Sequence, residues 1–248
     1  MNIILSGASG RMGRQVSAVC AAEGIPVRFG VDLKTEPYAS FPIYADFKSQ
    51  RAESGDVVID FSLPGSLKNL LDFCVPSSTP LVIATTGYSA EDEESILKAS
   101  RQIAVFRSAN MSLGVHVLKL LSQRAAAMLE GFDVEIVEKH HNQKLDAPSG
   151  TAVMLYDAVK KPDSVPMFDR TPFHRKRDPR EIGISSVRGG TVPGEHEVGF
   201  YGAGEKILIT HSAQDRSIFA SGAVRAAAFL DGVRSRPGIY TMDDMIQL

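Results

Sequence analysis

The chain has 248 residues, a formal net charge of −2, 44% apolar residues and 23% charged residues. These values are ordinary for one large or two modest globular domains, and the weak charge gives no reason to expect a nucleic-acid partner. No apolar run approaches the roughly 20 residues that span a bilayer, and the N-terminus lacks the pattern of a signal peptide, so we expect no membrane partner. The two cysteines, Cys20 and Cys74, lie in apolar surroundings without metal-ligand spacing, which predicts buried thiols and a cytoplasmic location.

The N-terminal part of the chain alternates predicted strands with predicted helices. Short apolar runs predict strands at 2–5, 27–31, 56–61, 81–84 and 103–106. Helical spacing of apolar residues predicts helices at 12–23, 66–74 and 90–101. This alternation is typical of βαβ units, so we expect an α/β fold with a Rossmann-type, doubly wound parallel sheet.

The pattern changes after about residue 110. Helices are predicted at 113–129, 152–159 and 218–230, and strands at 132–139, 182–188, 195–201 and 205–212. The strands suggest an antiparallel or mixed sheet, so we expect a second domain of the α+β class. The segment 160–181 is rich in proline and charge, and we expect it to form an extended surface loop that is too polar to pack.

A glycine-rich loop, Gly7-Ala8-Ser9-Gly10-Arg11-Met12-Gly13, lies between the first predicted strand and the first predicted helix. Glycines allow a tight turn and a close approach of the backbone to a pyrophosphate, which the unpaired amides of the following helix attract. The spacing is GxxGxxG rather than the commoner GxGxxG, so its place in the chain is the stronger argument for a dinucleotide site. A plain strand-to-helix turn is the alternative, and the absence of Gly-Lys-Ser/Thr argues against a P-loop.

Asp32 ends the second predicted strand, at the position where a carboxylate can hydrogen-bond the ribose hydroxyls of NAD and repel the 2′-phosphate of NADP. Lys34 could offset that repulsion, so we expect NADH to be preferred and NADPH to remain possible. The alternative is a strand-end acid that binds nothing. Arg11 and Arg14 either flank the phosphates or are solvated charges of the helix.

The densest group of titratable residues is the segment from Glu138 to Ala152, which includes His140, His141 and Lys144. Ser149, Gly150 and Thr151 then open a predicted helix, whose start would face the same loop. Cationic groups beside a helix N-terminus suit an anionic ligand such as a carboxylate, and a histidine can act as a general acid because its pKa lies near neutrality. A metal site is less favoured, because adjacent histidines diverge and no third ligand has suitable spacing. A solvated polar loop is the other alternative.

Together these motifs resemble the 4-hydroxy-tetrahydrodipicolinate (dihydrodipicolinate) reductase family over essentially the whole chain. HHNQKLDAPSGTA, from His140 to Ala152, is the most specific match, and GASGRMG matches the family's start. The other matching blocks are Asp60-Phe61-Ser62, Thr85-Thr86-Gly87, Asn110–Gly114, Arg188–His196 and Arg216–Arg225. The segment 152–187 is shorter than in many members.

The resemblance implies a dinucleotide-binding domain at 1–111, a substrate-binding and tetramerisation domain at 112–211, and a C-terminal segment at 212–248 that returns to the first domain. It also implies a homotetramer and the NAD(P)H-dependent reduction of a cyclic imine dicarboxylate on the diaminopimelate route to lysine. The domains would close about a hinge near Asn110–Gly114 and exclude water.

The resemblance also implies roles for individual residues. His140 would be the general acid and Lys144 a substrate anchor and catalytic partner. The residues that would contact the substrate carboxylates are His141, Ser149, Gly150 and Thr151. Besides the glycine loop and Asp32, the residues expected to bind the cofactor are Thr85, Thr86, Gly87, Ala109, Asn110 and Met111.

Two other functions remain open at this point. Another two-domain dehydrogenase, acting on an amino acid such as aspartate or homoserine, would share the glycine loop but would not require the His140–Ala152 segment. A non-catalytic dinucleotide sensor would bind NADH and reduce nothing.

Overall fold

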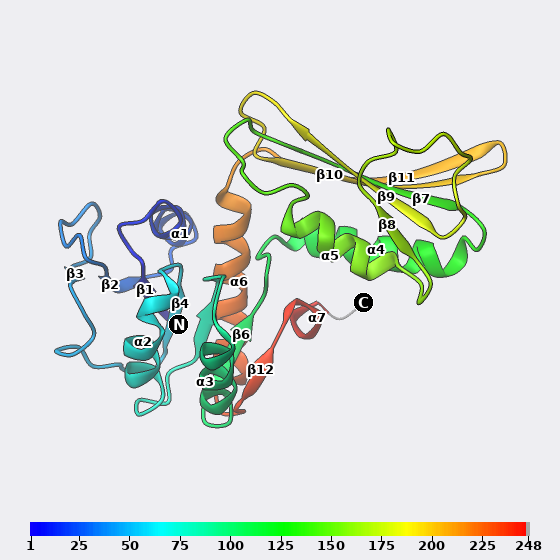
Figure 1. Cartoon of the computed structure of the whole chain (residues 1–248). Coiled ribbons are helices and arrows are strands. Elements are labelled where there is room, and N and C mark those ends of the chain that lie inside the picture. Colours follow the sequence, from blue (N-terminus) through cyan, green and yellow to red (C-terminus); the bar gives the residue numbers. More distant parts are fainter. Residues whose placement is uncertain (247–248) are drawn as a thin grey trace. The chain divides into compact units, whose positions relative to one another are not determined.

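The computed structural model describes residues 1–246, which form two compact units (Figure 1). The first unit comprises residues 1–112 and 216–246, and the second comprises Leu113–Asp215. The C-terminal residues therefore share a unit with the N-terminal residues, although the whole second unit separates them in the sequence.

A seven-stranded sheet with the order β12-β6-β5-β4-β1-β2-β3 forms the centre of the first unit. Its strands are β1 (Asn2–Ser6), β2 (Val27–Val31), β3 (Ile43–Tyr44), β4 (Asp56–Asp60), β5 (Leu81–Ile83), β6 (Ala104–Arg107) and β12 (Gly238–Tyr240). All neighbouring strands are parallel. The strand order reverses between β1 and β4, and ligands of doubly wound sheets bind beyond the carboxyl ends of the strands at such a point. The predicted Rossmann-type sheet is confirmed.

Helices cover both faces of this sheet, because successive buried side chains of a strand point to opposite faces. The helices are α1 (Arg11–Ala22), η1 (Pro64–Ser66), α2 (Leu67–Cys74), α3 (Ala90–Ser100), α6 (Ser217–Val233) and α7 (Met242–Met245). Ile3 and Leu5 of β1 pack in one cluster with residues of α1 and α6. Ile4 packs in the other, with residues of α2 and α3.

Small residues let α6 approach its neighbours closely. The buried face of α6 includes Ala220, Gly222, Ala223, Ala226 and Ala227. A β-carbon on Gly222 would lie 1.6 Å from the carbonyl oxygen of Met111, so only glycine fits there. The segment after β6 and the helix α6 are thus packed against each other within the first unit.

The second unit is a mixed five-stranded sheet with the order β11-β10-β7-β9-β8 and two helices on one face (Figure 1). Its elements are α4 (Leu113–Met128), β7 (Asp133–His140), α5 (Gly150–Val159), β8 (Val165–Met167), β9 (Glu181–Arg188), β10 (Gly194–Gly202) and β11 (Glu205–Ala213). β7 pairs with β10 in an antiparallel and with β9 in a parallel manner. Leu118 of α4 and Leu155 of α5 pack on Ile136, Val198 and Phe200 of the sheet. The predicted second α+β domain with a mixed sheet is confirmed.

Residues 161–180 are exposed or half-buried, as expected of a surface segment, but the segment is not simply a loop. The segment contains β8, and its arginines bind carboxylates of the sheet. Arg170 and Arg175 both pair with Glu181, which is only 4% exposed, and Arg177 pairs with Glu135 and Asp133. Charged residues can be buried when they are paired, and composition alone does not show the partners.

The sequence did not predict β3, β12 or α7, which have two, three and four residues. Elements this short carry too little hydrophobic periodicity to be recognised. Their pairing is decided by neighbouring strands that are distant in the sequence.

Cys20 and Cys74 are free and buried, as predicted, and burial raises the pKa of the Cys20 thiol to about 11. Among residues 1–246, none of the helices combines the length and the apolar character needed to cross a bilayer.

Candidate active site

The glycine loop forms a tight turn between β1 and α1. The amides of Gly7 and Ala8 both donate to the carbonyl of Val31, at 2.9 and 3.3 Å. Gly7 has a φ of +76°, and a β-carbon there would lie 2.6 Å from the carbonyl oxygen of Phe61. A β-carbon on Gly13 would lie 2.2 Å from the carbonyl oxygen of Gly7. The first and third glycines are therefore required by close backbone contacts.

The start of α1 fits a pyrophosphate. Gly10 is the N-cap residue, and no side chain caps the helix. The first-turn amides of a helix have no partner within the helix and attract anions. The donor set that a dinucleotide requires is therefore present in this loop.

Asp32 lies beside the glycine loop as the sequence predicted. Its Oδ2 accepts a hydrogen bond from the amide of Ser9 (3.0 Å), and its Oδ1 accepts one from the amide of Lys34 (3.1 Å). The hydroxyl of Ser9 donates to the carbonyl of Lys34 at 2.6 Å. These bonds fix the carboxylate next to the loop that would hold the phosphates.

Tyr38 adds support that the sequence did not reveal. Its hydroxyl donates to the carbonyl of Ala8 (2.8 Å), and the guanidinium of Arg14 stacks 4.1 Å from its ring centre. The Nε of Arg14 also donates to the carbonyl of Ser9. Arg14 is thus held against the loop, whereas Arg11 is exposed on α1.

The other predicted cofactor residues follow strands of the same sheet. Thr85 follows β5, and its hydroxyl donates to the buried carboxylate of Asp60 at the end of β4 (2.7 Å). Thr86 and Gly87 continue this loop, and Gly87 has a φ of +85°. The 109–111 stretch follows β6, and the side chain of its Asn110 accepts from the amide of Ser112 (2.8 Å). Because the strands are parallel, these segments share the sheet edge that carries the glycine loop.

The second group of predicted residues lies in the second unit, where β7 ends. His140 is its last residue, and Lys144 follows in the next loop, 22% exposed and paired with Asp146 at 2.8 Å. The amide of His141 donates to Val192, and that of Asn142 donates to Gly190. The loop after β7 is therefore held along the loop between β9 and β10.

The helix start at Ser149 adjoins the same place. Ser149 is the N-cap of α5, and its Oγ accepts from the amide of Ala152 (3.2 Å). Gly150 and Thr151 form the first turn. The structure thus brings His140, Lys144 and the start of α5 to one end of the second unit.

A buried carboxylate, that of Glu138, joins these parts. Its Oε2 accepts from Nδ1 of His140 (2.5 Å) and Nη1 of Arg188 (2.8 Å). Its Oε1 accepts from Nη2 of Arg188 (2.7 Å) and from the amide of Ser149 (3.1 Å). Burial raises the pKa of Glu138, but hydrogen bonds, those from Arg188 first, outweigh it and bring that pKa to about 2. The carboxylate is therefore ionised at neutral pH.

His140 itself is 8% exposed. Burial lowers its pKa below the ordinary value, and the positive charges of Lys144 and Arg188 act in the same direction. Glu138 opposes them by hydrogen bonding and by its charge. The ring therefore lies between competing charges, as is common for groups that move protons.

His196 of β10 lies against the ring of His140. Its ring is perpendicular to that of His140, with centres 5.1 Å apart, and its Nε2 is hydrogen-bonded to Oγ of Ser149 (3.0 Å). His196 is 4% exposed, and burial, followed by the nearby His140, lowers its pKa to about 4.

Two models of known families match the chain: "Dihydrodipicolinate reductase, N-terminus" matches residues 1–111, and "Dihydrodipicolinate reductase, C-terminus" matches residues 114–246. The chain belongs to the dihydrodipicolinate reductase family. A 4-hydroxy-tetrahydrodipicolinate reductase of Caldanaerobacter subterraneus subsp. tengcongensis is 47% identical over 100% of this chain and 98% of its own length. One from Staphylococcus carnosus is 44% identical over 99% of both chains. The family predicted from the motifs is confirmed, and the protein is an oxidoreductase.

Solved structures agree on the fold. A dipicolinate-bound dihydrodipicolinate reductase from Paenisporosarcina sp. TG-14 has a TM-score of 0.80 at 22% identity and covers 99% of both chains. An aspartate dehydrogenase from Thermotoga maritima has a TM-score of 0.53 at 12% identity, over 93% of this chain and 96% of that one. The aspartate dehydrogenase thus shares only the fold with this chain, whereas the two relatives at 47% and 44% identity are 4-hydroxy-tetrahydrodipicolinate reductases.

Sequence reasoning gave no role to Glu138, Arg188, Gly194 or His196. The period-two pattern of β7 could have placed Glu138 on the same face as His140. The pairing of β7 with β9 and β10, which brings Arg188 and His196 to that face, could not be read from the sequence.

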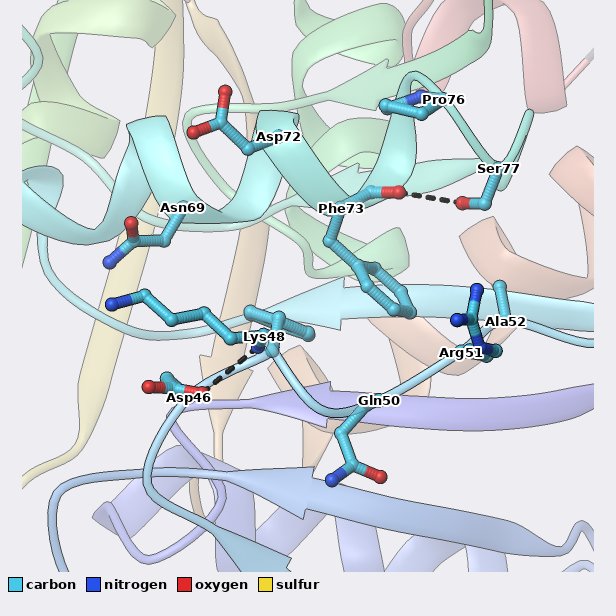
Figure 2. Close-up of a pocket in the computed structure, with 11 residues that line it drawn as sticks. Asp46, Lys48, Gln50, Arg51, Ala52, Asn69, Asp72, Phe73, Pro76 and Ser77 are labelled. Carbon is cyan, nitrogen blue, oxygen red and sulfur yellow. Dashed lines mark hydrogen bonds between the residues drawn. The ribbon is translucent and has the colours of Figure 1, made fainter.

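A cavity of about 530 Å³ in the first unit lies elsewhere (Figure 2). Phe73 of α2 points into it, and the segment from Asp46 to Ala52 forms another wall. None of the predicted cofactor residues lines it.

Proposed function

We propose that this chain reduces a dihydrodipicolinate-type cyclic imine dicarboxylate to tetrahydrodipicolinate, with His140 as the proton donor. The observation that carries this proposal is the hydrogen bond between His140 and the buried carboxylate of Glu138, beside Lys144 and the start of α5. It supports His140 as the proton donor, because the ring adjoins groups suited to an anion. Family membership supports the reaction and its place in lysine biosynthesis.

The reductant is a pyridine nucleotide, and when bound it supplies the hydride. We propose that the 7–13 loop and the start of α1 hold its pyrophosphate, and that the 85–87 and 109–111 segments adjoin its nicotinamide. Asp32 supports a preference for NADH, because its fixed carboxylate suits ribose hydroxyls and repels a 2′-phosphate.

His140 would neutralise the negative charge that develops on the substrate ring. Its Nδ1 faces an ionised carboxylate, which only accepts hydrogen bonds, so Nδ1 carries a hydrogen and Nε2 is the atom that gives the proton. The pKa of His140 is lowered in the protein alone. Two substrate carboxylates nearby would raise it and favour the protonated acid.

Lys144 and the first turn of α5 would hold the substrate carboxylates. The ammonium group of Lys144 already binds a carboxylate, that of Asp146, at 2.8 Å. The amides of Gly150 and Thr151 lie at a helix N-terminus, which favours negative charge. His141 would complete the site. Fixing both carboxylates orients the ring for reaction.

We further propose a homotetramer built on the face of the second sheet opposite α4 and α5. Within Leu113–Asp215 the helices α4 and α5 cover one face only (Figure 1). The alternating side chains of the other face include Val187, Tyr201 and Leu208, which are 47%, 37% and 42% exposed. Apolar groups exposed on a sheet face favour burial by another subunit. Leu208→Lys should shift sedimentation from tetramer to smaller species.

A cytoplasmic location is also proposed, since Cys20 and Cys74 are unpaired thiols that suit a reducing compartment.

The decisive experiment follows NADH oxidation at 340 nm with substrate generated enzymatically in situ from pyruvate and aspartate semialdehyde. The wild type should turn over, and His140→Ala should lose roughly 10²–10⁴-fold in rate with NADH binding kept. His174→Ala, at an exposed position, is the matched control. Binding of NADH without turnover in the wild type would identify a sensor instead, and full turnover of His140→Ala would refute the role of His140.

A further inference from the structure

Glu138 is surrounded by donors only. Four hydrogen bonds from three residues, His140, Arg188 and Ser149, occupy both carboxylate oxygens, and the side chain has no exposed surface. An ionised carboxylate has about four acceptor positions. The group is thus fully satisfied inside the unit, and solvent does not replace any of its partners.

We propose that Glu138 is a positioning residue of the reaction: it holds His140 with Nε2 as the proton-transfer atom and ties that ring to the first turn of α5. This inference rests on the proposed function, in which His140 gives the proton and α5 binds a substrate carboxylate. Glu138 itself does not face the substrate.

The tautomer of His140 follows from its contact with Glu138. An ionised carboxylate cannot donate, so the 2.5 Å contact requires a hydrogen on Nδ1. The opposite tautomer would set a lone pair against the negative charge. Glu138 therefore decides which ring nitrogen reaches the substrate.

The charges around His140 act in opposite directions on its proton affinity. The groups that face its ring are Glu138 on β7, Arg188 on β9, His196 on β10, and Lys144 with its partner Asp146 in the following loop. Glu138 alone would stabilise the imidazolium strongly. Arg188 binds the same carboxylate through both Nη atoms and limits that effect, so the ring can lose its proton.

Glu138 also links His140 to the start of α5. One oxygen of Glu138 binds the amide of Ser149, the N-cap of α5, while the other binds His140. A change at Glu138 therefore disturbs the acid and the helix start together. Arg188 adds a bond to the carbonyl of Asp146 (2.7 Å), which ties in the loop that carries Lys144.

The test compares the pH dependence of kcat/KM in four variants: Glu138→Gln, Arg188→Met, the double variant, and Glu195→Gln as control. Glu195 is the neighbouring ion-paired acid on β10, bound to Lys139 on the other face of the sheet. For a proton donor, kcat/KM falls as pH rises through its pKa.

Glu138→Gln should lower kcat roughly 10²-fold and move this fall to lower pH by about one unit, because the negative charge that favours the imidazolium is gone. Arg188→Met should move it to higher pH, because Glu138 then has His140 as its main charged partner. The control should leave it in place. Opposite displacements in the two single variants are not expected from loss of structure.

The double variant separates positioning from folding. Removing both charges avoids an unpaired buried charge, so its Tm should recover towards that of the wild type while kcat stays low. If kcat recovers together with Tm, Glu138 is only structural and the inference is overturned. Nitrogen NMR of labelled histidines, with His140→Gln to assign the signal, reports the tautomer without substrate; a wild-type His140 with hydrogen on Nε2 alone would also overturn it.

The two proposals fail in different ways. Normal turnover in His140→Ala would refute the proposed function. An impaired His140→Ala beside an unaffected Glu138→Gln would refute the positioning role alone.

Discussion

A β-carbon at position 194 would lie 3.0 Å from Nε2 of His140 and 3.4 Å from its Cδ2. The ring has little room to move away, because Glu138 holds its Nδ1 and the ring of His196 lies against it. Gly194, the first residue of β10, therefore leaves open the nitrogen to which we assign proton transfer.

Gly194→Ala should reduce kcat/KM by about tenfold or more while the fold is kept, because the added methyl group crowds Nε2 of the proton donor. Steady-state kinetics and a thermal melt measure the two quantities. Gly189→Ala is the control, since a β-carbon there meets nothing within 4 Å. Equal activity of the two variants would show that Nε2 is not the reacting atom.

Asp32→Ser should shift the ratio of NADPH to NADH affinity towards NADPH by about tenfold, because it removes the charge that repels a 2′-phosphate. Fluorescence titration of both reduced cofactors gives the ratio. Glu36→Ser removes an exposed charge close by and should leave the ratio unchanged. A wild type that prefers NADPH more than tenfold would contradict our interpretation of Asp32.

Lys144→Ala should raise KM and lower kcat together, by roughly 10-fold or more each, because it removes a cationic partner of a substrate carboxylate. Lys160→Ala, which breaks an exposed ion pair with Asp157, should change neither. An unchanged KM in Lys144→Ala would exclude the anchoring role.

Acid should destabilise the protein through His196. Its pKa is lowered from 6.5 to about 4 in the folded state, so below pH 6.5 the unfolded chain binds a proton that the folded chain does not. Above pH 6.5 there is no such effect; the loss of stability grows as pH falls below 6.5 and is complete near pH 4, a total of about 3 kcal/mol at 1.36 kcal/mol for each pKa unit.

Urea unfolding at pH 7 and pH 5 tests this expectation. The free energy of unfolding should fall less between these values in His196→Gln than in the wild type, whereas the exposed His174→Gln should behave as the wild type. An identical fall in all three proteins would mean that His196 is not buried as a neutral ring.

Two glycines of α6 should respond in opposite directions to alanine. Gly222→Ala should destabilise the first unit by about 3 kcal/mol or more. The reason is that its β-carbon would overlap the carbonyl oxygen of Met111, so the backbone would have to shift. Gly232→Ala meets nothing within 4 Å and should stabilise the helix by up to about 1 kcal/mol. Denaturation midpoints of both variants measure the contrast, and equal effects would contradict the close packing of α6.

The helices and strands of ordinary length could be predicted from the sequence because their hydrophobic periods are local. β2 was predicted with its observed bounds, and α1 and α4 within one residue at each end. The short strands β3 and β12 could not be, since pairing with distant strands forms them. The surface position of the 160–181 segment was predicted, but its ion pairs were not, because their partners Glu181 and Glu135 lie on β9 and β7.

The sequence by itself determined the family, the Rossmann-type sheet with its glycine loop, and the two basic candidate residues, His140 and Lys144. These follow from local patterns and from a specific motif. Only the tertiary structure decided the surroundings of His140, because Glu138, Arg188, Gly194 and His196 come from three strands whose pairing no local pattern records. The proton affinity of a buried ring depends on those neighbours, and the sheet register brings them together.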